Sequence, residues 1–229
     1  MQKTILISGV ARGIGRYLVH ELLKRDYFVI GLTRSEDSKN ELIDTLKGQG
    51  FKYFEIINCD IANQEALYYL GQKLKTITNS IDVLINNAGL GIGGGLLKDQ
   101  SVEYIYSVFN VNFFGAWRLY QTVDSLLFEG SKVINVSSSM GLSTDLEQGG
   151  YPVYRLSKWA LNGFSIQLGA ELKSRDINVY AVCPGWTQTD MGGEGAPNTI
   201  DQGADTILWL TENAGIDNGF YRDRKKREW

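Results

Sequence analysis

Short apolar runs alternate with longer amphipathic segments along nearly the whole chain. The strand candidates are, in order, Thr4–Ser8, Tyr27–Leu32, Tyr53–Asn58, Val83–Asn86, Lys132–Ser137, Asn178–Val182 and Gly219–Tyr221. Several of them are apolar at consecutive positions, which is typical of strands covered on both faces, as in a parallel sheet. The helix candidates between them are Gly15–Arg25, Gln64–Thr76, Val102–Leu127 and Val153–Ser174, and Ile200 opens one more. This alternation predicts a doubly wound α/β fold.

No internal repeat, low-complexity stretch or Pro/Gly/Ser-rich linker divides the sequence, so we expect residues 1–229 to form one domain. Pro152 is expected at the start of a helix, where its missing N–H costs little. The glycine-rich stretches Gly91–Gly95 and Gly192–Gly195 are predicted to be loops after strands. Ligands bind at such strand ends in open α/β sheets.

Composition narrows the class of protein. Hydrophobic residues make up 43% of the 229 residues and charged residues 21%, which is the balance of a globular domain rather than a disordered chain. The net charge of -3 gives no broad basic field, so a nucleic-acid partner is not expected. No apolar run approaches the roughly 20 residues that cross a bilayer, so neither is a membrane partner.

The few cysteines and the single histidine indicate the redox compartment of the protein and exclude some kinds of catalytic site. Cys59 and Cys183 stand far apart without CxxC spacing, which fits small buried hydrophobes in a reducing compartment. The apolar part of the first residues is too short for a signal peptide, so we expect a cytoplasmic protein. Because His20 is the only histidine, a metal site or a His-dependent triad is not expected.

A glycine cluster, Ser8-Gly9-Val10-Ala11-Arg12-Gly13-Ile14-Gly15, follows the first predicted strand and opens the first helix. Glycines there allow a tight turn and let backbone approach a pyrophosphate at the positive end of a helix. The spacing differs from the commoner Gly-x-Gly-x-x-Gly fingerprint, and a purely structural turn would use the same residues.

The end of the second strand bears on the choice of nucleotide. Dinucleotide-binding domains that prefer NAD carry an acid about 20 residues after the glycines. This chain has the neutral Thr33 there, followed by Arg34, and Arg12 lies in the glycine turn. Two converging guanidinium groups would suit the 2′-phosphate of NADP, whereas both could equally be solvated surface arginines.

Tyr154 and Lys158 are spaced by one helical turn and therefore share a helix face. An ammonium near a phenol lowers the pKa of the phenol towards the range useful for general acid–base catalysis. A Tyr-x-x-x-Lys pair is common and indicates catalysis only together with the residues around it. That context is Ser137-Ser138-Ser139 at the end of a central strand, although serines at strand ends are more often turn formers.

Taken together, these motifs resemble the short-chain dehydrogenase/reductase family, in particular its single-domain, carbonyl-reductase-like members. The matches run in order over nearly the whole chain: Ser8-Gly9-x-x-x-Gly13-Ile14-Gly15, Asp60, Asn86-Asn87-Ala88-Gly89, Asn112, Ser138, Tyr154-x-x-x-Lys158 and Pro184-Gly185. The resemblance implies a Rossmann-type, mainly parallel seven-stranded sheet with helices on both faces. It also implies an oxidoreductase that transfers hydride between NADP(H) and a carbonyl or alcohol.

The resemblance implies roles for four catalytic residues. Tyr154 would be the general acid–base, Lys158 would lower its pKa and hold the nicotinamide ribose, and Ser138 would donate to the substrate oxygen. Asn112 would bind a water that links Lys158 to solvent, a role compatible with an amide that bends its helix. The gap from Ser138 to Tyr154 is longer than usual in the family, so Ser137 or Ser139 could supply the hydroxyl instead.

The cofactor would contact residues from several strand ends. Asp60, with Ile61 beside it, would accept from the adenine amino group, although Asp60 alone would suggest a helix N-cap. The full set expected at the cofactor is Ser8, Gly9, Arg12, Gly13, Ile14, Gly15, Thr33, Arg34, Asp60, Ile61, Asn87, Ala88, Gly89, Tyr154, Lys158, Pro184, Gly185, Thr187 and Thr189.

The substrate pocket is expected to be apolar or aromatic, with a small lid after Met191. Its predicted lining is Leu90, Ser138, Met140, Tyr151, Trp186 and Met191. Fold alone does not define the substrate in such a family.

Three alternatives remain open from the sequence. The chain could be an NADP(H)-binding regulatory protein or sensor that keeps the fold, although such a protein has no need of Tyr154. It could also be a structural or signalling partner whose exposed helices bind protein. The apolar faces of Val102–Leu127 and Val153–Ser174 could form a homodimer or homotetramer interface, as in many relatives, or pack on the sheet. The basic tail from Tyr221 to Trp229 could bind an anionic surface, but a solvated end after the last strand is the simpler interpretation.

Overall fold

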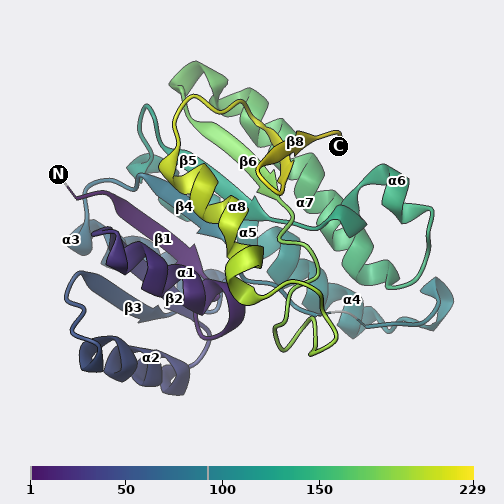
Figure 1. The fold of residues 1–229 in the computed structure, drawn as a ribbon, viewed down its shortest axis with the longest axis horizontal. Helices are drawn as coiled ribbons and strands as arrows, with labels where there is room; N and C mark the ends of the chain where they lie inside the picture. Colours follow the sequence, from purple (N-terminus) through teal and green to yellow (C-terminus); the bar gives the residue numbers. More distant parts are fainter. Residues whose placement is uncertain (1, 92) are drawn as a thin grey trace.

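The computed structural model describes residues 2–91 and 93–229, so Ile92, in the predicted loop Gly91–Gly95, and Met1, in the first residues considered for a signal peptide, lie outside the described residues. The strands form one sheet in the order β3-β2-β1-β4-β5-β6-β7-β8, in which all neighbours are parallel except β7 and β8. The strands are β1 (Thr4–Ser8), β2 (Phe28–Thr33), β3 (Phe54–Asn58), β4 (Val83–Asn86), β5 (Lys132–Val136), β6 (Asn178–Val182), β7 (Gly219–Arg222) and β8 (Lys225–Arg227). This confirms the predicted doubly wound, mainly parallel fold (Figure 1).

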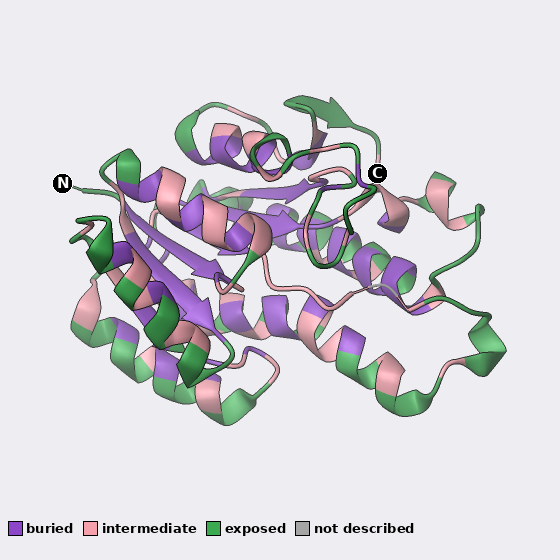
Figure 2. Cartoon of the chain, turned by 60° about the horizontal axis from the view of Figure 1, so that its bottom comes forward, coloured by how far each residue is buried: buried purple, intermediate pink, exposed green. Residues whose placement is uncertain are grey.

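Helices cover both faces of the sheet. They are α1 (Gly13–Lys24), α2 (Glu36–Gly48), α3 (Gln64–Ile77), α4 (Val102–Phe109), α5 (Ala116–Val123), α6 (Ser143–Leu146), α7 (Pro152–Glu171) and α8 (Ile200–Glu212). One buried cluster joins the strands to α1, α2 and α8, and a second joins them to α3, α5 and α7. Strands β1 to β7 are therefore largely buried on both faces, whereas β8 is exposed and the helices alternate buried and exposed positions (Figure 2).

The sheet has eight strands where seven are predicted. The tail is not simply a solvated end, because Lys225–Arg227 pairs antiparallel with β7. The two residues between the strands, Asp223 and Arg224, both have positive φ angles, 52° and 56°. Positive φ at both central residues defines the tight turn whose twist matches a two-stranded hairpin.

The predicted helix Val102–Leu127 is observed as one helical run from Val102 to Leu126, and the type of helix changes along it. Helix α4 gives way to a π-helical segment, Asn110–Gly115, which leads into α5 and a 3₁₀ turn at Asp124–Leu126. Helix α2, which the sequence patterns did not single out, is capped by the Ser35 hydroxyl, which accepts from the Ser38 N–H. Helix α7 begins at Pro152 and α8 at Ile200, as expected. None of the helices within the described ranges is long and apolar enough to cross a membrane.

Candidate active site

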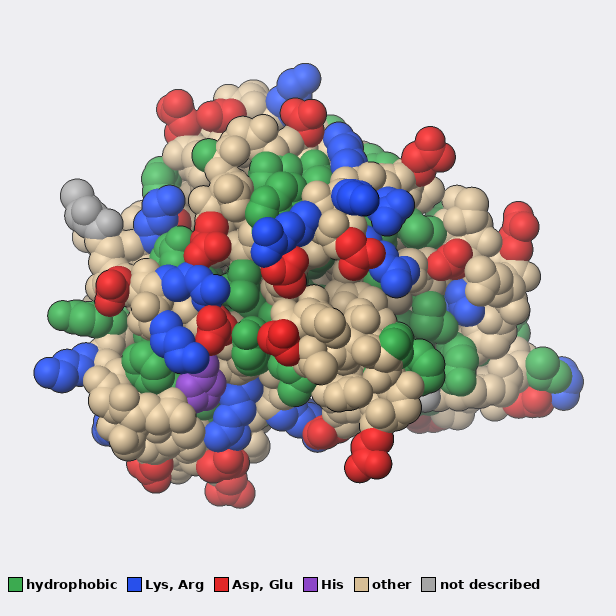
Figure 3. Space-filling view, viewed as in Figure 1, with side chains coloured by type: hydrophobic (Ala, Val, Ile, Leu, Met, Phe, Trp, Pro, Cys, Tyr) green, Lys and Arg blue, Asp and Glu red, His purple; other side chains and the backbone are tan. Residues whose placement is uncertain are grey.

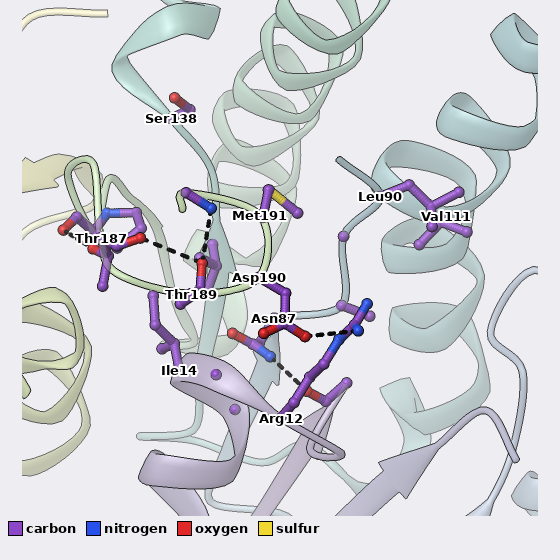
Figure 4. A pocket seen from close by; sticks show the side chains of 18 of the residues that line it. Arg12, Ile14, Asn87, Leu90, Val111, Ser138, Thr187, Thr189, Asp190 and Met191 are labelled. Atoms are coloured by element: carbon purple, nitrogen blue, oxygen red, sulfur yellow. Dashed lines mark hydrogen bonds and ion pairs between the residues drawn. The ribbon is translucent and has the colours of Figure 1, made fainter. Parts of the chain in front are cut away.

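A cavity of about 620 Å³ opens along the carboxyl edge of the sheet (Figure 4). Its walls come from residues that follow β1 to β6, from α7 and from the end of β7. The predicted residues that line it are Gly9, Arg12, Gly13, Ile14, Gly15, Thr33, Arg34, Asp60, Ile61, Asn87, Ala88, Gly89, Leu90, Ser138, Met140, Tyr154, Lys158, Pro184, Gly185, Trp186, Thr187, Thr189 and Met191. Residues that lie far apart in the sequence are thus brought to one cavity by the parallel sheet.

The glycine turn after β1 packs tightly against the loop after β4. Gly9 has a φ of 73°, and a Cβ on it would lie 2.7 Å from Ala88 Cα. Helix α1 starts at Gly13 with no side-chain cap at Arg12 and no acid in its first turn. The first N–H groups of a helix have no intrahelical acceptors, so this uncapped end is suited to an anion such as a diphosphate.

Ser8 does not line the cavity, contrary to the prediction that it contacts cofactor. It is fully buried, and its Oγ accepts from the backbone N–H groups of Asn87 and Ala88, both at 3.1 Å. The Asn87 amide in turn donates to the carbonyls of Ser8 and Gly9, both at 3.0 Å. Ser8 therefore positions the loop after β4 against the glycine turn.

The two predicted arginines differ in their surroundings. Arg12 makes an ion pair with Asp190 on the loop after β6, 2.7 Å apart, and both side chains are mostly exposed (Figure 4). Arg34 makes no ion pair with any residue that the structure describes. An exposed ion pair of this kind is weak, so the predicted contact of both arginines with a 2′-phosphate stays a prediction.

Polar groups around Arg34 complete this end of the cavity. The Thr33 hydroxyl donates to the Ser35 carbonyl at 3.2 Å, and Ser35 and Ser38 also line the cavity. The sequence analysis missed both serines, although their place after β2 was a usable signal. Asp60 does not cap α3, because Asn63 does so, and Asp60 Oδ1 instead accepts from Ala62 N at 2.9 Å.

Helix α7 carries Tyr154 and Lys158 on its buried face, with 7% and 4% of each residue exposed. Lys158 Nζ donates to the Val136 carbonyl at the end of β5, 2.8 Å away, and lies 5.7 Å from the centroid of the Tyr154 ring. Ser138 follows β5 and also lines the cavity. The three side chains therefore meet where β5 ends.

Burial dominates the ionisation of the tyrosine and the lysine. It raises the pKa of Tyr154 to about 12, while the neighbouring Ser138 hydroxyl acts in the opposite direction. Burial also lowers the pKa of Lys158 to about 8. Desolvation is the largest influence on both groups, and the Lys158 ammonium donates to the Val136 carbonyl. The lowering of the Tyr154 pKa by Lys158 stays a prediction for the protein with cofactor bound.

A buried amide on α7 fixes the serine loop. The Ser137 hydroxyl donates to Asn162 Oδ1 at 2.6 Å, and Asn162 Nδ2 donates to the Gly141 carbonyl at 2.9 Å. These bonds hold the chain on both sides of Ser138. Ser137, Ser138 and Ser139 all line the cavity, but Ser137 is buried and its hydroxyl is already bonded to Asn162.

Asn112 lies in the π-helical segment and does not line the cavity. Its Oδ1 accepts from Leu90 N at 2.7 Å, and its Nδ2 donates to the Leu90 carbonyl at 3.3 Å and to Ser157 Oγ at 3.0 Å. Protein groups already bond to this side chain, and its predicted role in binding a water stays a prediction. Asn112 ties the loop after β4 to α7.

The walls beyond Ser138 are largely apolar and include Leu90, Met140, Trp186 and Met191. Tyr151, predicted to join them, does not line the cavity. It precedes α7 with a φ of 49°, and 44% of it is exposed. Lining residues that the sequence analysis missed are Ala11, Leu32, Cys59, Val111, Val136, Cys183, Asp190, Gly192 and Arg222. Cys183 and Arg222 could have been found from their places at the ends of strands.

Comparison with known proteins identifies the family of this chain. The family model described as short chain dehydrogenase matches residues 3–200. The chain belongs to the short-chain dehydrogenase family. The predicted resemblance is therefore confirmed, and the chain is a member of an oxidoreductase family.

Individual members give the same picture. The ketoacyl reductase HetN of Nostoc sp. is 33% identical over 192 residues, which is 82% of this chain but 65% of the HetN length. The carbonyl reductase Sniffer of D. melanogaster has a TM-score of 0.87 at 26% identity, covering 96% of both chains. A short chain dehydrogenase from Burkholderia cenocepacia in complex with NADP has a TM-score of 0.84 at 25% identity, covering 95% of this chain and 94% of that one.

Proposed function

We propose that this short-chain dehydrogenase is an NADP(H)-dependent oxidoreductase that interconverts an aldehyde or ketone and its alcohol. The observation that carries the proposal is the convergence of Ser138, Tyr154 and Lys158 on one wall of a cavity whose far end holds the glycine turn and Arg34. Solved relatives include a complex with NADP and a carbonyl reductase. The apolar walls favour an apolar or aromatic body for the substrate.

The residues present fit a dinucleotide. The uncapped N-terminus of α1 would receive the diphosphate, and the small Ala88 and Gly89 leave room for close approach. Thr33 places no carboxylate at the end of β2, and Arg34 with the Ser35 and Ser38 hydroxyls would receive a 2′-phosphate. We therefore favour NADP(H) over NAD(H). When bound, the nicotinamide supplies or accepts the hydride.

The side chains of the chain would handle the substrate oxygen and its proton. Ser138 would donate a hydrogen bond to the oxygen as negative charge grows on it. Tyr154, with a pKa of about 12, is protonated at neutral pH and would give its proton to the developing alkoxide. In the opposite direction, Tyr154 would take the proton of the alcohol as the base.

The proposal is tested by NADPH oxidation with a panel of aldehydes, ketones and quinones, comparing the wild-type protein with Tyr154→Phe. Removing only the phenol hydroxyl should lower kcat by roughly 10²- to 10⁴-fold, the usual range for a lost general acid. The dissociation constant for NADPH, measured by fluorescence, serves as the control and should change little.

Other outcomes decide against the proposal. Full activity in Tyr154→Phe would exclude the tyrosine as the acid, and failure of the wild type to bind NADPH would overturn the cofactor assignment. Tight NADPH binding without turnover of any compound would favour the alternative of an NADP(H)-binding regulatory protein or sensor.

A further inference from the structure

Arg222 places a second cation in the cavity, far from Arg34. Arg34 follows β2 and Arg222 ends β7, and both line the cavity. The sheet order separates these strands by five strand spacings, which amounts to about 24 Å at the usual ~4.8 Å between neighbours. The Arg222 end therefore lies beyond Ser138, on the side away from the proposed 2′-phosphate site.

The guanidinium of Arg222 reaches back over the neighbouring strand. A Cβ on Gly185, just after β6, would lie 4.0 Å from Arg222 Nη2. Strand β6 is the neighbour of β5, whose end carries Ser138. The guanidinium therefore lies beside Gly185, at the end of the strand between β7 and the Ser138 end of β5.

Arg222 is poorly satisfied by the protein itself. Its Nε is buried and has no hydrogen-bond acceptor among the described residues. The one carboxylate paired with it is that of the exposed Asp223, 3.5 Å from Nε. Because 41% of the Arg222 side chain is exposed and the residue lines the cavity, its terminal nitrogens remain available to a ligand oxygen.

The surroundings favour an anion at this end. The acidic residues that line the cavity are Asp60, after β3, and Asp190, which is paired with Arg12. Lys225, Lys226 and Arg227 form β8 beside Arg222, while Arg224 is paired with Asp205. Figure 3 shows blue Lys and Arg side chains gathered over the β7–β8 hairpin, with acidic side chains between them.

We propose that Arg222 binds a carboxylate of the substrate, so that the substrate is an aldehyde or ketone with an apolar body and a carboxylate. The planar guanidinium matches a carboxylate in a two-bonded geometry. Because Asp223 offsets part of the charge, a monoanion fits this position better than a phosphate dianion. This inference rests on the proposed carbonyl reduction and names its substrate class.

A matched pair of compounds tests the inference. 4-Carboxybenzaldehyde and its methyl ester share the reacting aldehyde and the aromatic body and differ in charge. With NADPH, we expect the wild-type protein to favour the acid, and Arg222→Gln to lower the ratio of kcat/KM for acid over ester by roughly 10- to 100-fold, mainly through KM. Arg222→Lys, which keeps the charge but not the planar fork, should retain part of the preference.

Lys225→Gln is the matched control, because Lys225 pairs with Arg222 across the hairpin and does not line the cavity. It removes one positive charge from the same hairpin and should leave the ratio unchanged. An unchanged ratio in Arg222→Gln, or an equal fall in Lys225→Gln, would overturn the inference. The inference would also fail if Arg222→Gln raised the dissociation constant for NADPH but left the acid-to-ester ratio of kcat/KM unchanged.

A binding measurement separates this inference from the proposed function. If the wild-type protein reduces neither compound, carbonyl reduction of this class fails, and titration with benzoate and benzamide then decides the role of Arg222. Preferential binding of benzoate that is lost in Arg222→Gln supports the carboxylate site. Equal binding of the two compounds contradicts it.

Discussion

The side chain of Lys158 changes its charge close to neutral pH. It lies inside the protein with a bond to the Val136 carbonyl, and burial brings its pKa down to about 8. A lysine is cationic below its pKa and neutral above it, so Lys158 is mostly charged at pH 7 and loses its charge just above. The proton of Tyr154, with a pKa of about 12, is retained throughout this interval.

We therefore predict that carbonyl reduction declines on the alkaline side with an apparent pKa near 8. The reason is that the proposed role of Lys158, holding the nicotinamide ribose, needs the charged ammonium. The measurement is kcat/KM with NADPH from pH 6 to pH 10. In Lys158→Arg, whose guanidinium stays charged, the residual activity should lack this decline. A flat wild-type profile up to pH 10 would contradict the prediction.

Individual site residues were predictable where the backbone decides their place. Gly9, Gly13 and Gly15 follow from the tight turn between β1 and α1. Ser8 and Asn112 were assigned to the site by their motifs, yet their side chains bond to backbone that comes close only in the folded sheet. Such tertiary hydrogen bonds leave no pattern along the sequence.

At the scale of elements, one buried lysine joins a strand to a helix end. Lys132 begins β5, and its Nζ donates to the carbonyls of Leu210, Thr211 and Asn213, at 2.7, 2.9 and 2.7 Å. These carbonyls lie at the C-terminal end of α8, where the helix dipole favours a cation. Burial lowers the Lys132 pKa to about 8, so the ammonium remains mostly charged at pH 7.

We predict that Lys132→Met lowers the free energy of unfolding by about 1.5–3 kcal/mol, the usual worth of hydrogen bonds to a charged group. Methionine keeps much of the side-chain volume but leaves the three carbonyls without their donor. Urea unfolding at pH 7 measures the effect. The control is Lys47→Met at an exposed position of α2, which should stay within about 0.5 kcal/mol of the wild type. Equal stability of the two variants would contradict the role of Lys132.

Elements with strong periodicity were predictable, and those defined by tertiary contacts were not. All seven predicted strands were found to within one residue, several of them because they are apolar at consecutive positions. The π-helical break at Asn110–Gly115 was not, since its local sequence continues an amphipathic pattern. Strand β8 was missed because Lys225–Arg227 is wholly charged and is defined by its pairing with β7.

At the scale of the whole molecule, apolar side chains remain on the outer face of α7 and next to it. Leu156, Trp159 and Ile166 are exposed at positions that share a helix face, and a Cβ on Gly163, between them, would meet nothing within 4 Å. Trp117, on α5 beside them, stacks on Phe164 and is itself 41% exposed. A patch of this kind marks an interaction surface, and the gap at Gly163 would let another helix approach closely.

We predict that this face joins two copies of the chain, as the apolar helix faces of the sequence already suggested. Trp159→Glu places a charge in the middle of the face, so it should shift the protein from dimer or tetramer towards monomer, as measured by light scattering after size-exclusion chromatography. Tyr53→Glu is the matched control, because Tyr53 is an aromatic that is 59% exposed and lies just before β3, the strand at the far edge of the sheet. Helix α7 carries Tyr154 and Lys158 on its opposite, buried side, so dimerisation would also stabilise the active site. The monomeric variant should therefore lose activity at a lower temperature than the control. A wild-type protein that is monomeric at tens of micromolar, or a Trp159→Glu variant that keeps its oligomeric state, would exclude this interface.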